Sequence, residues 1–276
     1  MDLTSKKNIK NLLKKHDLRP TKWLGQNFLI DKNVLKKIIL TSELNGFDEV
    51  LEIGPGIGTL TQELAKKVKK VMAVEKDRKM VDILKETLKG FENVDIILGD
   101  IRKIEDYKVK IENYKVVGNL PFYLTAPIIR KFLEMKEAKP QSMVLIVQKE
   151  VGQRICAKPS KMNLLAVSVQ FYAEPQMISY ISKKSFWPQP KVDAAIIKIT
   201  PKPSLIGDSK LFFKVVKAGF SQPRKQLINN LSKGLKMPRE KVKAWLLENN
   251  ILPIQRAETL TVENWLKLVK TLKVDN

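Results

Sequence analysis

Between residues 49 and 150, short apolar runs alternate with stretches in which apolar residues recur every three or four positions. The runs have the length and composition of buried strands; they are 50–53, 71–75, 94–98, 115–118 and 143–147. The intervening stretches have the periodicity of helices; the clearest are 59–69, 77–89 and 127–133. Strands that alternate with helices at this spacing predict an α/β fold with an open, mostly parallel sheet and helices on both faces.

The pattern changes after residue 160. Residues 177–182 and 194–199 read as two strands joined by a proline-rich loop, which predicts an antiparallel hairpin at the end of the sheet. Residues 164–172 fit either a helix or a strand. After Pro201-Lys202-Pro203 the chain reads as helical throughout, at 208–220, 223–235, 238–250 and 261–273. We therefore predict a Rossmann-like domain over residues 1–202 and a small, basic, all-helical domain over residues 203–276.

Two features precede the sheet. Residues 1–20 are rich in lysine, and we interpret them as a basic leader, either a short helix or a mobile arm, with a solvated leader favoured. Asp31 stands immediately before apolar positions with helical spacing, from Val34 to Ile39, and is a predicted N-cap.

The charge balance indicates the kind of partner. The 276 residues include 51 Lys and Arg against 29 Asp and Glu, a formal net charge of +22. Such an excess favours nucleic acid, through neutralisation of phosphates and release of counterions. With Cys156 as the only cysteine and His16 as the only histidine, an intrachain disulfide or a Cys/His zinc site is excluded. We find no signal peptide or membrane span and expect a cytoplasmic protein.

Chemically distinctive residues gather where the predicted strands end, which is where open α/β sheets bind ligands. Gly54, Gly56 and Gly58 form a turn that lets a ligand approach the backbone, although their spacing differs from the dinucleotide fingerprint. Glu75 ends the second strand and suits the two hydroxyls of a ribose, and Asp100 follows the third and suits an adenine amine. Each residue alone has a structural alternative, as a turn glycine, a helix cap or a turn aspartate.

The fourth strand ends in Asn119-Leu120-Pro121-Phe122. Proline biases the residue before it toward extended geometry, so the Leu120 carbonyl and the Asn119 side-chain oxygen become two fixed acceptors. With an aromatic ring beside them, they suit a flat heterocycle that carries an exocyclic amine. The alternative is a strand that ends at a proline turn, with Phe122 in the core. Four such features at successive strand ends indicate a nucleoside ligand and an amine as the reacting group.

These segments resemble one family, the small-subunit ribosomal RNA adenine dimethyltransferases, which are class I S-adenosylmethionine-dependent enzymes. The matching segments are Gly25-Gln26-Asn27-Phe28-Leu29, Glu52-Ile53-Gly54-Pro55-Gly56-Ile57-Gly58, Glu75, Gly99-Asp100, Asn119-Leu120-Pro121-Phe122, and Phe186-x-Pro188-x-Pro190-Lys191-Val192-Asp193. They span nearly the whole chain, so the resemblance is specific.

The resemblance implies site roles. S-adenosylmethionine would be bound by Gln26, Asn27, Leu29, Gly54, Gly56, Glu75, Lys76, Asp100, Ile101 and Asn119. Catalysis would rest on Asn119, Leu120, Pro121 and Phe122, while Phe122 and Phe186 would stack on the target base. No metal is implied. The substrate would be small-subunit rRNA within a pre-30S-type particle, and the enzyme a monomer.

One departure and three alternatives accompany the resemblance. The family commonly has Asn-Leu-Pro-Tyr-Asn where this chain has Phe122 and Tyr123, so a hydroxyl at position 122 is lost while stacking is kept. Enzymes that methylate a large-subunit adenine typically show Asn-Ile-Pro-Tyr, and Leu120 argues against them. A non-catalytic assembly factor is disfavoured by the intact acids and Asn119. A methyltransferase for proteins or small molecules is disfavoured by the charge.

Overall fold

The computed structural model describes residues 1–20, 26–107, 113–121, 124–135, 138–203 and 209–272. The chain divides into two compact units. The first comprises Met1–Gly152 and Pro175–Pro201, and the second comprises Gln153–Glu174 and Lys202–Asn276. The second unit thus includes residues 153–174, which the sequence-based prediction assigns to the first domain.

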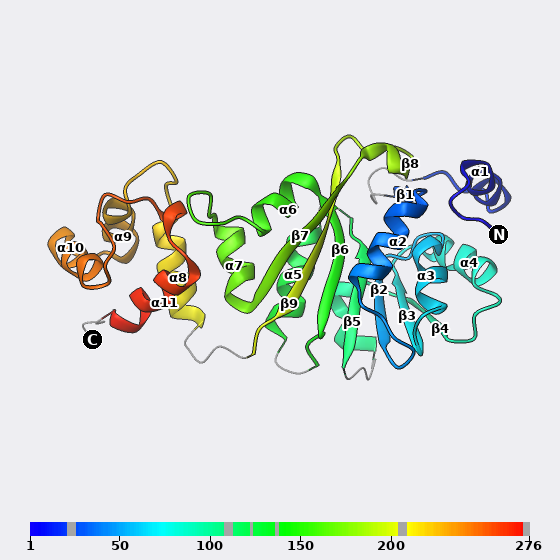
Figure 1. The fold of residues 1–276 in the computed structure, drawn as a ribbon, viewed down its shortest axis with the longest axis horizontal. Coiled ribbons are helices and arrows are strands. Elements are labelled where there is room, and N and C mark those ends of the chain that lie inside the picture. Colours follow the sequence, from blue (N-terminus) through cyan, green and yellow to red (C-terminus); the bar gives the residue numbers. More distant parts are fainter. Residues whose placement is uncertain (21–25, 108–112, 122–123, 136–137, 204–208, 273–276) are drawn as a thin grey trace. The chain divides into compact units, whose positions relative to one another are not determined.

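Helices cover both faces of a seven-stranded sheet in the first unit (Figure 1). The strands lie in the order β4-β3-β2-β5-β6-β9-β7. Their bounds are β2 Glu49–Ile53, β3 Lys70–Glu75, β4 Val94–Leu98, β5 Tyr114–Asn119, β6 Ser142–Gln148, β7 Ala173–Ile181 and β9 Ala194–Pro201. The helices that flank them are α2 Lys32–Thr41, α3 Thr59–Ala65, α4 Arg78–Thr87, η2 Ile101–Tyr107, α5 Thr125–Glu134 and α6 Lys149–Ile155.

Strands β4, β3, β2, β5 and β6 are parallel, and β9 pairs antiparallel with β6. This confirms the predicted mostly parallel sheet with an antiparallel strand near its end. The chain reverses its direction of travel across the sheet at β2, which has β3 on one side and β5 on the other. The carboxyl ends of β2 and β5 therefore form the topological switch point, where such folds bind ligands.

Aspartates start the helices around this point. Asp31 accepts hydrogen bonds from the Asn33 and Val34 amides, which confirms it as the N-cap of α2. Asp77, which the sequence reading did not single out, accepts from the Lys79 amide at the start of α4. Because such a side chain satisfies backbone donors that the helix leaves unpaired, the first turn of each helix is fixed next to the strand ends.

The interpretation of residues 1–20 as a solvated leader is wrong. Lys6–Lys15 form helix α1, capped by Ser5. Its apolar residues Ile9, Leu12 and Leu13 are buried in a cluster with residues of α4 and of the loop before α3. Burial of this amphipathic stripe stabilises the helix, while its lysines project from the opposite face.

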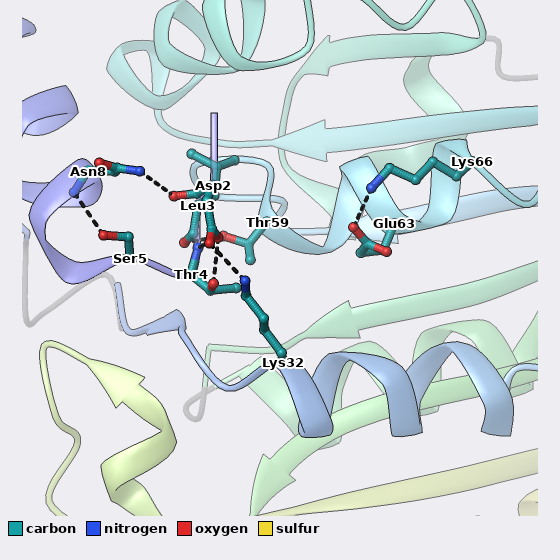
Figure 2. A network of polar contacts seen from close by, with 9 residues as sticks. All are labelled: Asp2, Leu3, Thr4, Ser5, Asn8, Lys32, Thr59, Glu63 and Lys66. Carbon is teal, nitrogen blue, oxygen red and sulfur yellow. Dashed lines mark hydrogen bonds and ion pairs between the residues drawn. The ribbon is translucent and has the colours of Figure 1, made fainter.

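Polar contacts fix the residues before α1 as well (Figure 2). Asp2 accepts a hydrogen bond from the Lys32 ammonium at 2.8 Å, and the Thr59 hydroxyl donates to the Leu3 carbonyl at 3.5 Å. The hydrogen bond from Lys32 lowers the pKa of Asp2, and the hydrogen bonds from the Thr4 hydroxyl and amide act in the same direction. The start of the chain is thus attached to the first residues of α2 and α3.

Two short segments form a second, two-stranded sheet that the sequence reading did not predict. Strands β1 (Phe28–Leu29) and β8 (Phe186–Trp187) are antiparallel, with Phe28 opposite Trp187 and Leu29 opposite Phe186. The Ile30 amide donates to the Ser185 carbonyl at 2.9 Å, and the Ser185 hydroxyl donates to Asp31 at 2.9 Å. The segment expected to bind the cofactor and the segment expected to contact the base are therefore joined directly.

The second unit is a helical bundle. Its helices are α7 Leu164–Tyr172, α8 Ser209–Gly219, α9 Leu227–Leu235, α10 Arg239–Glu248 and α11 Val262–Thr271. They enclose one core, in which Trp265 is completely buried. The ambiguous stretch 164–172 is a helix, and the four C-terminal helices lie close to their expected positions. Within the described part of the chain, every helix is too short or too polar to cross a bilayer.

Candidate active site

A cavity of about 380 Å³ lies at the carboxyl ends of the central strands. All ten residues that the family resemblance assigned to the cofactor line it: Gln26, Asn27, Leu29, Gly54, Gly56, Glu75, Lys76, Asp100, Ile101 and Asn119. They come from β1 and the two residues before it, from the loop after β2, from the end of β3 and the residue after it, from the segment between β4 and η2 together with the first residue of η2, and from the end of β5. Segments that are up to 93 residues apart in sequence are thus brought to one hollow.

The glycine loop and Glu75 hold each other in place. Gly56 has a φ of +59°, a conformation that is strained for residues with a Cβ, and its amide donates to Glu75 Oε2 at 3.1 Å. Glu75 Oε1 accepts from the amides of Lys76 and Asp77 at 2.8 and 2.9 Å. Burial raises the pKa of Glu75, although the three backbone donors oppose this. The carboxylate therefore fixes the loop at the cavity wall.

A second acid, Glu52, lies beneath the same loop. It is 1% exposed, lines the cavity, and its Oε2 has no hydrogen-bond partner among the described residues. Burial raises the pKa of Glu52 to about 8, the Glu75 charge acts in the same direction, and the Thr61 hydroxyl acts in the opposite one. The sequence reading included Glu52 in the motif but gave it no role, because an acid inside a strand pattern gives no sign of its burial.

Asn119 is oriented by the cofactor-side segment. Its Nδ2 donates to the Asn27 carbonyl at 3.0 Å. Because the amide oxygen lies on the other arm of the planar group, this bond directs Oδ1 away from Asn27. The Leu120 amide donates to the Ile146 carbonyl at 3.2 Å and anchors the backbone that follows β5. Asn119 and Pro121 line the cavity, while the Leu120 side chain is buried beside it.

The strand that carries Asn119 approaches the end of β2 closely at Gly118. Gly118 lies opposite Ile53 in the β2–β5 register, and a Cβ on it would stand 2.8 Å from the Ile53 carbonyl oxygen. Only glycine allows this separation without a shift of the backbone. Gly118 is a site-shaping residue that the sequence reading treated as ordinary strand.

Asp100 is already engaged by cations. Its carboxylate accepts from Arg102 through both oxygens, and the Lys76 ammonium lies 3.2 Å from its Oδ2. The hydrogen bonds from Arg102 lower the pKa of Asp100, so it is ionised at neutral pH. An adenine amine that binds there would share this carboxylate with Arg102.

The two predicted stacking residues are not both at the cavity. Phe122 lies outside the described residues. Phe186 is 3% exposed and packs in the core cluster that contains Leu29, and it does not line the cavity. A base-stacking role for Phe186 therefore requires strand β8 to shift, and the role stays a prediction.

Apolar residues complete the cavity wall. Phe28, Ile57, Met80, Leu124, Ile128 and Ile146 line it together with the polar groups. Phe28 and Ile57 belong to the segments that match the family but have no predicted role, and the other four read as ordinary apolar positions. Such a wall suits the flat face of a purine ring, while the acids and the amide set its orientation.

The sequence matches the ribosomal RNA adenine dimethylase family over residues 17–273. A protein named ribosomal RNA small subunit methyltransferase A from Dehalococcoides mccartyi is 43% identical over 264 residues, covering 94% of this chain and 90% of the relative. One of the same name from Bacillus mycoides is 40% identical over 285 residues, covering 98% of this chain and 97% of the relative.

Solved structures show the same architecture. A dimethyladenosine transferase from Plasmodium falciparum is similar with a TM-score of 0.73 and 25% identity, over 87% of this chain and 95% of that one. The 23S rRNA methyltransferase ErmE is similar with a TM-score of 0.72 and 25% identity, over 88% of this chain and 98% of that one. The match over nearly the full length shows that this chain belongs to the ribosomal RNA adenine dimethylase family.

Proposed function

We propose that this protein transfers methyl groups from S-adenosylmethionine to the N6 amine of adenosines in small-subunit rRNA, forming dimethyladenosine. The substrate adenosines would be two adjacent ones near the 3′ end, modified during ribosome biogenesis. The observation that carries the proposal is Asn119 at the switch point, where the Nδ2 bond to the Asn27 carbonyl directs Oδ1 away from the cofactor-side segment. The names of the relatives, which specify the small ribosomal subunit, support this substrate.

The cavity fits S-adenosylmethionine in its chemistry. Four acidic side chains line it, those of Glu52, Glu75, Asp77 and Asp100, although the chain as a whole carries a charge of +22. The unpartnered Oε2 of Glu52 favours a ligand that brings it a hydrogen-bond partner. Glu75 would accept from the ribose hydroxyls, Asp100 and Ile101 would hold the adenine, and the glycine loop would hold the methionine part. When bound, the cofactor supplies an electrophilic methyl group.

The chain's contribution to the reaction is alignment and charge stabilisation. The lone pair of an adenine amine is delocalised into the ring, so the amine is a poor nucleophile. Hydrogen bonds donated by the amine to Asn119 Oδ1 and to the Leu120 carbonyl favour a pyramidal nitrogen and fix its lone pair. The same two acceptors stabilise the positive charge that grows on nitrogen as it attacks. No strong general base is needed, because the protonated amine product is acidic enough to lose its proton to water.

Stacking would hold the target base. In the proposal Phe122 and Phe186 lie against its two faces, and Pro121 limits the motion of the backbone between them. Phenylalanine at position 122 supplies a ring face without a hydroxyl, so the base would be held there by stacking alone.

Basic residues would bind the surrounding RNA. Arg224, Lys225 and Arg239 are exposed in the second unit, the first two just before α9 and the third at the start of α10. We propose that they contact phosphates in a pre-30S-type particle, and that the protein acts as a monomer in the cytoplasm. Binding by phosphate neutralisation implies an affinity that falls steeply with salt.

The test is methyl transfer from labelled S-adenosylmethionine to small subunits that lack adenine dimethylation, followed by nucleoside analysis. Wild type is compared with Asn119→Ala, and with Asn33→Ala as a matched control on the exposed face of α2. Large subunits serve as the second substrate. We expect dimethyladenosine in small-subunit RNA, at least 100-fold slower for Asn119→Ala, and unchanged for Asn33→Ala.

Two results would reject the proposal. Label in large subunits alone would assign the chain to the chemistry of ErmE, whose fold it shares equally well. Binding of S-adenosylmethionine without transfer to either subunit would indicate an assembly factor. Equal rates for wild type and Asn119→Ala would refute the role of Asn119 but would not change the assignment of the substrate.

A further inference from the structure

Helix α1 has a strongly basic outer face. Five of its ten residues are lysine and none is acidic. Lys6, Lys7, Lys10 and Lys14 are exposed, and within the described residues none of the four forms an ion pair. Lys7, Lys10 and Lys14 follow the three- and four-residue spacing of one helix face, so their charges form a stripe about 10 Å long.

The inner face of α1 excludes one common partner of basic amphipathic helices, a membrane surface. Such helices bind membranes by inserting their apolar face. In α1 that face is already buried against the protein, with Ile9 at 0% and Leu12 and Leu13 at 2% exposure. Only the cationic face is available, and a concentrated cationic stripe without acidic neighbours suits a polyanion.

Contacts on several sides fix α1 rigidly. Before the helix, Asp2 pairs with Lys32 and the Leu3 carbonyl accepts from Thr59 (Figure 2). At its end, Lys15 and His16 both contact Glu86 on α4, at 2.8 and 2.9 Å. A charged surface held in this way loses little conformational entropy when a ligand binds.

Helix α1 lies next to the candidate active site. The cluster that buries α1 contains Phe28, Ile57 and Met80, which also line the cavity. On the outer side, the Lys10 ammonium lies 5.9 Å from the centre of the Trp187 ring. Trp187 adjoins Phe186 in β8, so the cations begin beside the segment to which the proposed function assigns base stacking.

We propose that the lysine face of α1 binds the phosphate backbone of the substrate RNA beside the target adenosine. This rests on the proposed function and adds to it a binding surface on a helix that precedes the family match, which begins at residue 17. Lys6, Lys7, Lys10 and Lys14 would each neutralise a phosphate, while α1 itself takes no part in methyl transfer.

The test replaces all four lysines with glutamine, which keeps helix propensity and removes four charges. The control variant also introduces four glutamines, at Lys36, Lys37, Lys67 and Lys89. These are exposed lysines on α2 and beyond the ends of α3 and α4. Affinity for small subunits and for protein-free small-subunit rRNA is measured from low to moderate salt. Melting temperature and S-adenosylmethionine affinity report whether the fold and cofactor site are intact.

We expect the α1 variant to bind both substrates roughly 10- to 100-fold more weakly at about 0.1 M salt, with a salt slope smaller by about 3 to 4. The affinity of the control variant should fall by a few-fold at most. Equal losses in the two variants would refute the proposal, since only net charge would matter. If affinity falls for subunits but not for free rRNA, the proposal is also refuted, and the lysine face would bind an acidic ribosomal protein. Because these are binding measurements, their failure is distinguishable from a failure of methyl transfer.

Discussion

Replacing Glu52 with glutamine should change how stability depends on pH. Burial raises the pKa of Glu52 from 4.5 to about 8, so in the folded state its ionised form is disfavoured. The folded protein then binds more protons than the unfolded chain between these values, and its free energy of unfolding falls as pH rises through that window. Glu52→Gln keeps the shape of the neutral acid and removes this dependence.

The size of the effect follows from the shift. One pKa unit corresponds to about 1.4 kcal/mol, so the free energy of unfolding falls by about 5 kcal/mol across the whole window. About 3 kcal/mol of this loss falls between about pH 5.5 and 8.5. Urea unfolding followed by circular dichroism at a series of pH values gives the free energy at each. We expect the wild type to lose about 3 kcal/mol more than Glu52→Gln across that range.

A control and a clear contradiction accompany this prediction. Glu63→Gln removes one carboxylate from the exposed side of α3 (Figure 2). Its curve of unfolding free energy against pH should run nearly parallel to that of the wild type. If the Glu52→Gln and wild-type curves are parallel, Glu52 is ionised in the fold, and another group must satisfy its buried oxygen.

Three further predictions follow from the site. Gly118→Ala forces a Cβ against the Ile53 carbonyl and should lower the free energy of unfolding in urea by about 1–3 kcal/mol. Gly46→Ala, which has open space around its Cβ, should lower it by less than about 1 kcal/mol. Equal losses in the two variants would refute the close approach at Gly118. Glu75→Gln replaces a carboxylate that accepts three backbone hydrogen bonds and should weaken S-adenosylmethionine binding at least about 10-fold by calorimetry, and the exposed Glu92→Gln should leave it unchanged. RNA affinity should fall roughly 1000-fold between about 50 and 200 mM salt, and a flat dependence would contradict binding by phosphate neutralisation.

The sheet and the cavity were predictable because their signals are local and repeated. Buried parallel strands are short apolar runs whatever their partners, and each ends in a residue such as Glu75 or Asp100 whose chemistry stands out. The rule that strand ends converge then brings these residues together without knowledge of any contact.

What sequence reasoning missed depends on contacts between distant segments. Strands β1 and β8 have two residues each, too few for any periodicity, and exist because they pair with one another. Helix α1 does carry a signal, in the spacing of Ile9, Leu12 and Leu13, but the many lysines outweighed it in our interpretation. Burial of Glu52 and of Phe186 depends on packing that no single segment encodes.

Strand β1 also limits how the chain can vary in length. Its two residues enter different cores: Phe28 joins the cluster around α1, and Leu29 joins the cluster beneath the sheet. Because successive side chains of a strand point in opposite directions, one inserted or deleted residue would exchange the two. The same slip would also move the Asn27 carbonyl away from Asn119. Chimeras between relatives should therefore keep the segment from Gln26 to Asp31 intact, and place their junctions in exposed loops such as the one around Gly46.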